Sequence, residues 1–296
     1  MFSTYFNYSL LSIGALVSTL VGCGGSGGGG DEVAAAATTA TATATAVDPT
    51  GTAADDAGLS SETKKALAAP QGPCRPENVM PLMRAKFMPN VVVYPYGGYI
   101  IIESNGVPQH GSPYFPPGTP GHLPYNGGNP RFFNNGNPIS LDYRYRFVIP
   151  ACPYWPGYST PTPLGPIGVS VEGVPFYNQY AGGGALLGND ELDSFDQFNG
   201  HADPMRKYHY HKEPWWITQR LGKSALIGYL LDGFPVYGPH DNGQPVQWWQ
   251  LDGNHAHSHP TAEYPQGIYH YHVTDNPPYI NGGGFTGAPG YATLLP

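Results

Sequence analysis

Two copies of the sequence Tyr-His-Tyr-His are the residues of this chain best suited to chemistry. They occupy residues 208–211 and 269–272. In an extended strand, residues two apart point to the same face about 6.6 Å apart, so each block presents two imidazoles side by side with its tyrosines opposite. Neutral imidazole is the commonest side-chain metal ligand. Each block therefore predicts a pair of metal ligands.

A further histidine precedes each block, three residues before a proline, and a turn would bring it back to the pair that follows. Three nitrogens in each half would resemble a zinc or copper site with one position left open. Spacing leaves open whether each half binds its own ion or the six histidines surround one or two central ions. The predicted ligands are His201, His209, His211, His257, His270 and His272, with His259 and His255 as additional candidates.

The nature of the ligands narrows the choice of metal. No cysteine is free to supply a thiolate, and Met205 is the one thioether near the motif, so nitrogen ligands favour zinc or copper(II) as the cofactor. The alternative is that the histidines are structural and form hydrogen bonds between the two halves while the tyrosines pack in the core. Six histidines at positions matched between two repeats favour metal binding.

Several carboxylates could orient an imidazole or act as general bases. Formation of turns is the simpler explanation, above all for an aspartate followed by glycine. The chain contains no His-Glu-x-x-His, Gly-x-Ser-x-Gly, Cys-x-x-Cys or phosphate-binding loop, so the common hydrolase and nucleotide-dependent mechanisms have no support. The carboxylates predicted to lie around the metal ligands are Glu172, Asp193, Asp203 and Asp232.

The histidine blocks belong to an internal repeat. Residues 167–177 return as residues 227–237 with five of eleven positions identical, and a Tyr-His-Tyr-His block follows each copy at nearly the same distance. Two ordered blocks at matched spacing indicate a tandem duplication of about 60 residues. The predicted halves, about 165–222 and 225–287, should form two related parts of one domain.

The elements that must position the histidines are short strands. Runs of β-branched residues at 91–94 and 99–102 flank a Pro-Tyr-Gly-Gly turn and predict a hairpin, and residues 143–149 predict another strand. Residues 112–138 are so rich in Pro, Gly and Asn that a long ordered loop is expected. With 33 prolines, 41 glycines and 22 tyrosines, the chain predicts an all-β or β-dominated single domain, sandwich-like or barrel-like.

The N-terminal part predicts export. An apolar stretch from residue 10 ends in Leu-Val-Gly-Cys23, which resembles the site where bacterial lipoprotein precursors are cleaved and acylated, although residues 1–9 contain no Lys or Arg. We therefore expect a lipoprotein signal peptide at 1–23 and a membrane anchor on Cys23. Gly24, rather than Asp, after this cysteine favours the outer membrane of a bacterial cell envelope.

Residues 24–72 are dominated by Gly, Ala and Thr and bury too little apolar area to fold, so they predict a disordered tether before a domain at 73–296. Cys74 and Cys152 remain as an even pair, and their spacing does not decide whether they form a disulfide. The net charge of −8, with no run of Lys or Arg, argues against nucleic-acid binding.

The motifs also carry a family resemblance. The two Tyr-His-Tyr-His blocks, Asp-Gly-Phe-Pro-Val-Tyr-Gly at 232–238 and Asn-Gly-Val-Pro-Gln-His at 105–110 resemble the bacterial YHYH-domain family over about residues 99–287. The resemblance implies an exported bacterial protein but no assigned activity.

Three functions remain open. The first is a lipoprotein that stores, delivers or senses zinc or copper, and the second is a metalloenzyme with an open coordination site. The third is a carbohydrate or protein recognition module with structural histidines, in which the tryptophan pairs at 215–216 and 248–249 would form a platform. Core packing is the favoured role for those tryptophans.

Overall fold

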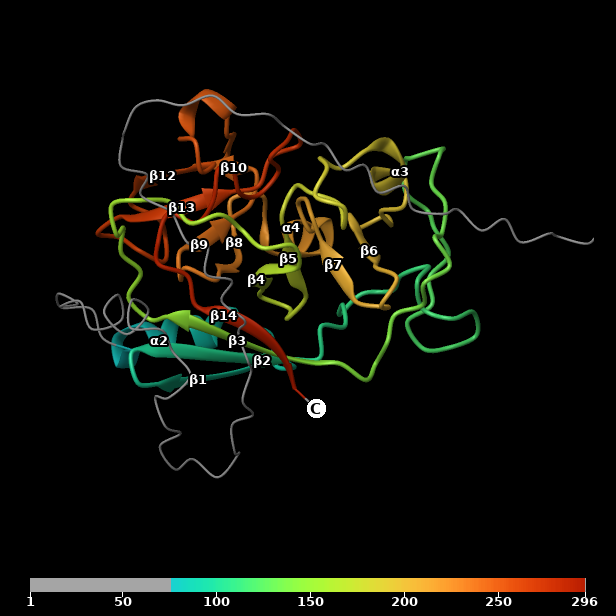
Figure 1. Cartoon of the computed structure of the whole chain (residues 1–296), viewed down its shortest axis with the longest axis horizontal. Coiled ribbons are helices and arrows are strands. Elements are labelled where there is room, and N and C mark those ends of the chain that lie inside the picture. The colour runs from blue at the N-terminus through green and yellow to red at the C-terminus, as the bar shows by residue number, and fades with distance from the viewer. Residues whose placement is uncertain (1–75, 296) are drawn as a thin grey trace, which may run out of the picture. The chain divides into compact units, whose positions relative to one another are not determined.

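The computed structural model describes residues 76–295 (Figure 1). The predicted signal peptide, the acylated Cys23, the tether and Cys74 therefore lie outside the described residues. Within the described part, strands dominate, and the prediction of a β-dominated fold is confirmed. None of the helices in this part is long and apolar enough to cross a membrane.

The first sheet has four antiparallel strands in the order β1-β2-β3-β14. Strands β1 (Val92–Tyr96) and β2 (Tyr99–Ser104) form the predicted hairpin, in which β-branched residues pair across the turn. Strand β3 (Arg144–Pro150) lies where the third strand was predicted, and β14 (Tyr291–Leu295) joins it from the C-terminus. Helix α2 (Pro76–Lys86) packs against β1 and β2.

The second sheet has eight strands in the order β12-β13-β9-β8-β4-β5-β7-β6 and carries the histidines (Figure 1). Its centre is the antiparallel pair of β4 and β8, and the strands on either side repeat the same arrangement, including one parallel pair in each half. The first half consists of β4 (Pro166–Ser170), β5 (Pro175–Tyr177), β6 (Gly200–Ala202) and β7 (Tyr208–Tyr210). The second half consists of β8 (Leu226–Leu230), β9 (Pro235–Tyr237), β12 (Ala256–His259) and β13 (Ile268–His272).

Short elements connect these strands. They are the helices α3 (Asn189–Leu192) and α4 (Trp215–Leu221), the small hairpin of β10 (His240–Asp241) and β11 (Gln244–Pro245), and the 3-10 helix η2 (Trp248–Gln250). Most of 112–138 is turn and irregular structure, in agreement with the predicted loop.

The tyrosines of the two blocks lie in the core, on the opposite side of their strands from the histidines. Tyr210 and Tyr271 are fully buried, and each donates its hydroxyl hydrogen to a buried carboxyl group. The acceptor is Glu172 for Tyr210, at 2.7 Å, and Asp232 for Tyr271, at 2.6 Å. Burial raises the pKa of Glu172 to about 7 and that of Asp232 to about 6, because the charged form loses its water.

Two details concern cysteine and tryptophan. Cys152 is buried and disulfide-bonded, whereas its candidate partner, Cys74, lies outside the described residues.

Trp216 packs against the core, but Trp248 and Trp249 are 75% and 65% exposed, so the prediction of core packing was wrong for that pair. Their 3-10 helix places no residue in the core.

Candidate metal centres

Three buried imidazoles of the first half meet at one edge of the eight-stranded sheet. His201 on β6 lies directly opposite His209 on β7, and His211 follows two residues later on the same face. The Nε2 atom of His209 lies 3.0 Å from that of His201 and 2.9 Å from that of His211. These three residues form the first centre.

The Nδ1 atoms of the first centre point away from its middle, to backbone carbonyls in two cases. Nδ1 of His209 lies 3.0 Å from the carbonyl oxygen of Lys207, and Nδ1 of His211 contacts the carbonyl oxygen of Asn178. A carbonyl oxygen only accepts, so each of these nitrogens must carry the ring proton. The Nε2 atoms then present lone pairs to one another.

His201 reaches the same tautomer through a hydroxyl group. Its Nδ1 lies 2.8 Å from Oγ of Ser194, and that hydroxyl donates its own hydrogen to the carbonyl oxygen of Glu191. The Ser194 oxygen therefore accepts from Nδ1 of His201. All three Nε2 atoms of the first centre are thus acceptors, and that of His209 lies at hydrogen-bond distance from the other two.

Four imidazoles of the second half meet at the opposite edge of the same sheet. His257 and His259 come from β12, His270 and His272 come from β13, and His257 lies directly opposite His270. One ligand atom from each of the four lies within 4.8 Å of the others. These four residues form the second centre, in which His259 is the additional ligand that the sequence allowed for.

The second centre has the same pattern of tautomers. Nδ1 of His270 donates to the carbonyl oxygen of Ile268 at 2.9 Å, and Nδ1 of His272 donates to that of Gly238 at 2.7 Å. Nδ1 of His259 likewise meets a carbonyl oxygen, that of Pro260, at 2.7 Å. The Nε2 atoms of His270 and His272 are buried and have no hydrogen-bond partner among the described residues. Most buried polar atoms in proteins have a hydrogen-bond partner, ordered water included.

Each half therefore has its own cluster, which answers the question that spacing left open. Five strand spacings separate β7 from β13, which is about 24 Å. A single ion cannot be shared over this distance.

One carboxylate lies beside each centre, and neither was predicted. Oε1 of Glu191, from helix α3, lies 3.4 Å from Nε2 of His201. Oδ2 of Asp241, from strand β10, lies 2.9 Å from Nε2 of His259. Both residues come from short connecting elements with no repeat-matched motif, so no sequence pattern indicated them.

The carboxylates predicted around the histidines lie elsewhere and contact no imidazole of either centre among the described residues. Asp193 pairs with Arg131 at 3.0 Å, and Asp203 accepts from the backbone N–H of Lys207 at 2.9 Å. Glu172 and Asp232 accept from the core tyrosines, as described above.

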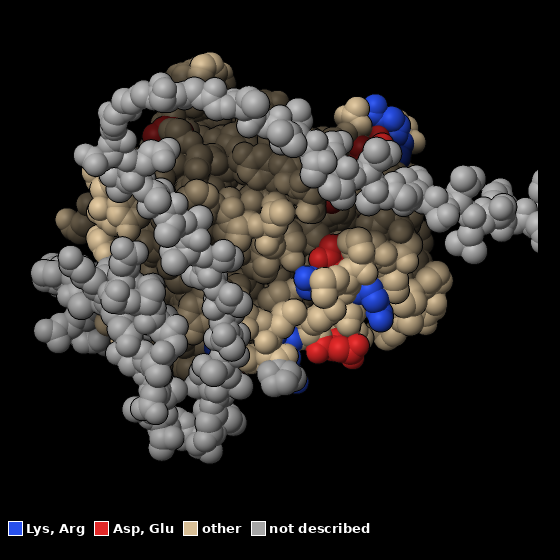
Figure 2. All heavy atoms as spheres, viewed as in Figure 1, with Lys and Arg blue, Asp and Glu red and all other residues tan. Residues whose placement is uncertain are grey.

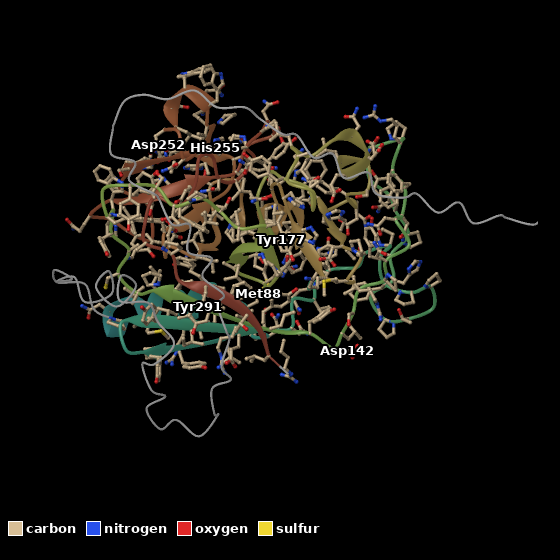
Figure 3. All side chains as sticks on the ribbon, viewed as in Figure 1. Met88, Asp142, Tyr177, Asp252, His255 and Tyr291 are labelled. Atoms are coloured by element: carbon tan, nitrogen blue, oxygen red, sulfur yellow. The ribbon has the colours of Figure 1, made fainter. Side chains whose placement is uncertain are left out.

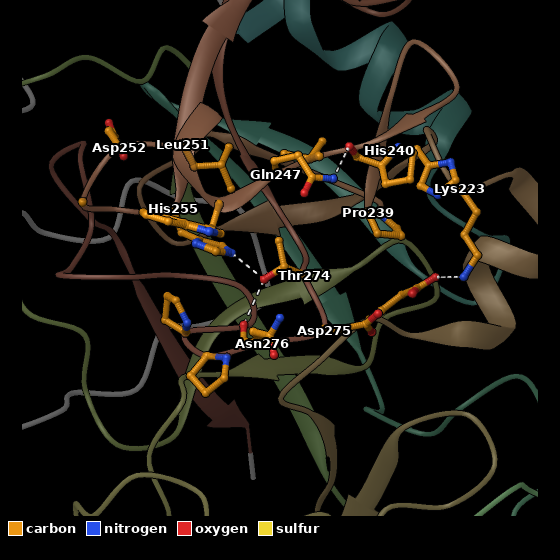
Figure 4. Close-up of a pocket in the computed structure, with 17 residues that line it drawn as sticks. Lys223, Pro239, His240, Gln247, Leu251, Asp252, His255, Thr274, Asp275 and Asn276 are labelled. Atoms are coloured by element: carbon orange, nitrogen blue, oxygen red, sulfur yellow. Dashed lines mark hydrogen bonds and ion pairs between the residues drawn. The ribbon is translucent and has the colours of Figure 1, made fainter.

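His255, the other additional candidate, faces away from the second centre. Its Nε2 lies 2.9 Å from Oγ1 of Thr274, and both residues line a hollow of about 870 Å³ (Figure 4). Its backbone N–H donates to the carbonyl oxygen of Asp252, which lies next to it in Figure 3. His255 therefore belongs to a turn and not to the centre.

Burial keeps the imidazoles of the first centre and of β13 neutral. Loss of solvent lowers the pKa of His209 and His270 to about 4 and that of His211 and His272 to about 3. The pKa of His201 lies well below its usual value for the same reason. Neutral imidazole is the form that coordinates metal ions.

Few charged groups surround this domain. On the face shown in Figure 2, Lys, Arg, Asp and Glu are scattered singly or in small groups among uncharged residues. Beyond the histidine centres, this face therefore offers no dense field of one sign to attract a charged ligand.

Comparison with known proteins gives one match. No curated protein and no solved structure matches the chain. The family described as "YHYH protein" matches residues 146–246, which include the whole first centre and the strands β8 and β9. The resemblance seen in the motifs is thus confirmed over this segment, which is similar to the YHYH protein family.

Proposed function

We propose that this domain binds one zinc or copper ion in each half and serves to store, deliver or sense that metal. The observation that carries the proposal is the facing arrangement of Nε2 lone pairs in both centres. A neutral imidazole has one ring proton, and hydrogen bonds to carbonyl or hydroxyl oxygens hold that proton on Nδ1 in six of the seven rings.

A purely structural role explains this arrangement poorly. Hydrogen bonds between imidazoles would need a proton on one Nε2 of each pair, as between His201 and His209 at 3.0 Å. In the first centre, where all three rings are buried, that proton would have to leave an Nδ1 that already faces an oxygen, or a second proton would have to charge a buried ring. A bound cation removes the conflict because every lone pair then has a partner.

The donor atoms fit zinc and copper(II). The first centre offers three imidazole nitrogens and the Glu191 carboxylate, and the second offers four nitrogens and the Asp241 carboxylate. The Nδ1 hydrogen bonds are the outer contacts that orient histidine ligands in known metal sites. With lipid attached at Cys23, the domain would present both ions in the bacterial cell envelope.

A metalloenzyme is the second candidate, favoured by one observation. His270, His272 and Asp241 line a hollow of about 650 Å³, so a substrate could approach an ion held there. This volume falls within the usual range for small-molecule sites.

The test is metal content in matched histidine variants. Purified protein is expected to carry two equivalents of zinc or copper by elemental analysis. His209→Ala should remove the equivalent of the first centre and His270→Ala that of the second, because each loses a central nitrogen of its cluster. The double variant should carry none.

His122→Ala is the control, since His122 lies outside both centres and contacts the carbonyl oxygen of Phe115. It should keep two equivalents. Wild-type protein that takes up neither metal, and whose melting temperature does not respond to chelator, would show that the histidines are structural.

A further inference from the structure

The two centres differ in how an ion can reach them. Resting on the proposed function, we infer that the second centre is the site of metal loading and release, whereas the first holds its ion as a fixed part of the fold. The inference goes beyond metal binding because it assigns different tasks to the two repeats.

Aromatic rings enclose the first centre. His201, His209 and His211 are each only 2% exposed. Tyr177 stacks on His209 with ring centroids 3.9 Å apart, and Phe195 lies parallel to His211 at 5.7 Å and edge-on to His201 at 4.8 Å. An incoming chelator can reach this ion only after local opening of the fold.

The repeat supplies the equivalent of Phe195 in the second half. Asp196 and Asp252 each begin the same turn, with backbone N–H groups bonded to the carbonyl oxygens of Gly200 and Ala256. Each aspartate also accepts from the first tyrosine of its Tyr-His-Tyr-His block, at 2.8 and 2.7 Å. The residue before each aspartate is Phe195 in the first half and Leu251 in the second.

This difference removes an aromatic cover from the second centre. Leu251 has no ring to stack on an imidazole, and its side chain lines the hollow that also contains His255 (Figure 4). On the other side, His270 and His272 line the 650 Å³ hollow. His270 and His272 are themselves 1% exposed and Tyr237 lies against both rings, but His257 and His259 are half-buried. The second centre is therefore open on its β12 side, where the first is covered.

One imidazole of the second centre is also easier to displace than those of the first, whereas the carboxylates beside the two centres are similarly exposed, at 33% for Glu191 and 27% for Asp241. The side chains of His259 and Asp241 are 25% and 27% exposed, and they contact each other at 2.9 Å. Asp241 stands on a two-residue strand beside a tight turn at Asn242 and Gly243, both with positive φ. A small chelating molecule with oxygen or nitrogen donors can replace these ligands one at a time. The ion then passes from imidazole nitrogens to the chelator with no change in oxidation state.

The number of ligands affects the equilibrium affinity for the ion, whereas access to the ion affects its exchange rate. Four nitrogens give the second centre one more imidazole than the first, which favours tighter equilibrium binding. The exchange rate depends instead on how readily a second ligand reaches the ion. The second centre is thus expected to bind at least as tightly as the first and to exchange faster.

The test is the release of zinc to a colorimetric chelator. Zinc-loaded protein should release one equivalent in a fast phase and one in a slow phase, about tenfold slower or more because it requires local opening. His270→Ala should abolish the fast phase, and His209→Ala the slow one.

Phe195→Leu, which places the second half's residue in the first half, should speed the slow phase several-fold and leave the fast phase unchanged. His259→Asp places the equivalent of Asp203 in the second half and should speed only the fast phase. This second variant tests the inference if Phe195→Leu fails to fold. A single phase for both equivalents, or loss of the fast phase in His209→Ala, would overturn the inference. Failure of the proposed function would appear differently, as wild-type protein that holds no zinc at the start.

Discussion

Replacing Gly228 with alanine is expected to lower the free energy of unfolding by about 3 kcal/mol or more. Gly228 lies in β8, at the pair of strands that joins the two halves of the sheet, opposite Ser170 of β4. A Cβ atom there would lie 2.4 Å from the carbonyl oxygen of Val169 and 2.5 Å from the ring of Phe176. The carbonyl oxygen of Val169 cannot move without breaking the β4–β8 pairing. The added methyl group therefore strains the strand pair at the centre of the sheet.

The repeat provides a matched variant. At Gly168, a Cβ atom would lie 2.5 Å from the carbonyl oxygen of Tyr229, so Gly168→Ala should destabilise the domain to a similar extent. Gly183→Ala is the control, because nothing lies within 4 Å of a Cβ atom at that position. Urea unfolding of the three variants measures the effect. Equal stability of Gly228→Ala and Gly183→Ala would show that the two halves are not joined through this close contact.

The same glycines show what sequence reasoning could reach. Gly168 and Gly228 were visible as identical residues of a repeat, and the hairpin of β1 and β2 followed from β-branched runs around a turn. The histidines were recognised because their alternation fixes one face of a strand, whatever the tertiary fold. Local rules were sufficient for these features.

The remaining features depended on contacts between distant segments. Whether the histidines form one cluster or two is decided by the order of strands, which places β6 and β12 at opposite edges of one sheet. Glu191 and Asp241 reach the centres from connecting elements whose position no periodicity predicts. Asp193 and Asp252 each follow a leucine, but the hydrogen bonds show that Asp196, and not Asp193, is the equivalent of Asp252.

Replacing Asp232 gives the second large effect, and the size of this effect depends on pH. The carboxyl group accepts from the Tyr271 hydroxyl at 2.6 Å, from the backbone N–H of Gly287 at 3.0 Å and from that of Phe234 at 3.3 Å. Asparagine in its place would turn an amide group with two hydrogens toward one of these donors, whereas the protonated carboxyl group carries one hydrogen, which it can place on either oxygen. We therefore expect Asp232→Asn to destabilise the domain in acid, where the wild-type carboxyl group is protonated.

The destabilisation should shrink as the pH rises. Burial raises the pKa of Asp232 from 3.8 to about 6, so the folded state holds this proton more tightly than the unfolded state does. The resulting stability is fully present below pH 3.8 and is lost as the pH rises through about 6. One pH unit corresponds to about 1.4 kcal/mol per proton. The difference between wild type and Asp232→Asn should thus fall by about 3 kcal/mol between pH 4 and pH 8.

Urea unfolding of both proteins at pH 4, 6 and 8 measures this difference. The histidines titrate alike in both proteins, so their contribution to the free energy of unfolding cancels. Asp142→Asn removes one negative charge from an exposed position and serves as the control. Glu172→Gln, the matched change in the first half, should show the same trend up to about pH 7, where the pKa of Glu172 lies. A difference that stays constant across this range would mean that burial does not raise the pKa of Asp232. If the trend appears in both variants, a buried acid on the core side stabilises the Tyr-His-Tyr-His strand in each half of the sheet. The opposite side of the strand then remains free for the imidazoles to converge.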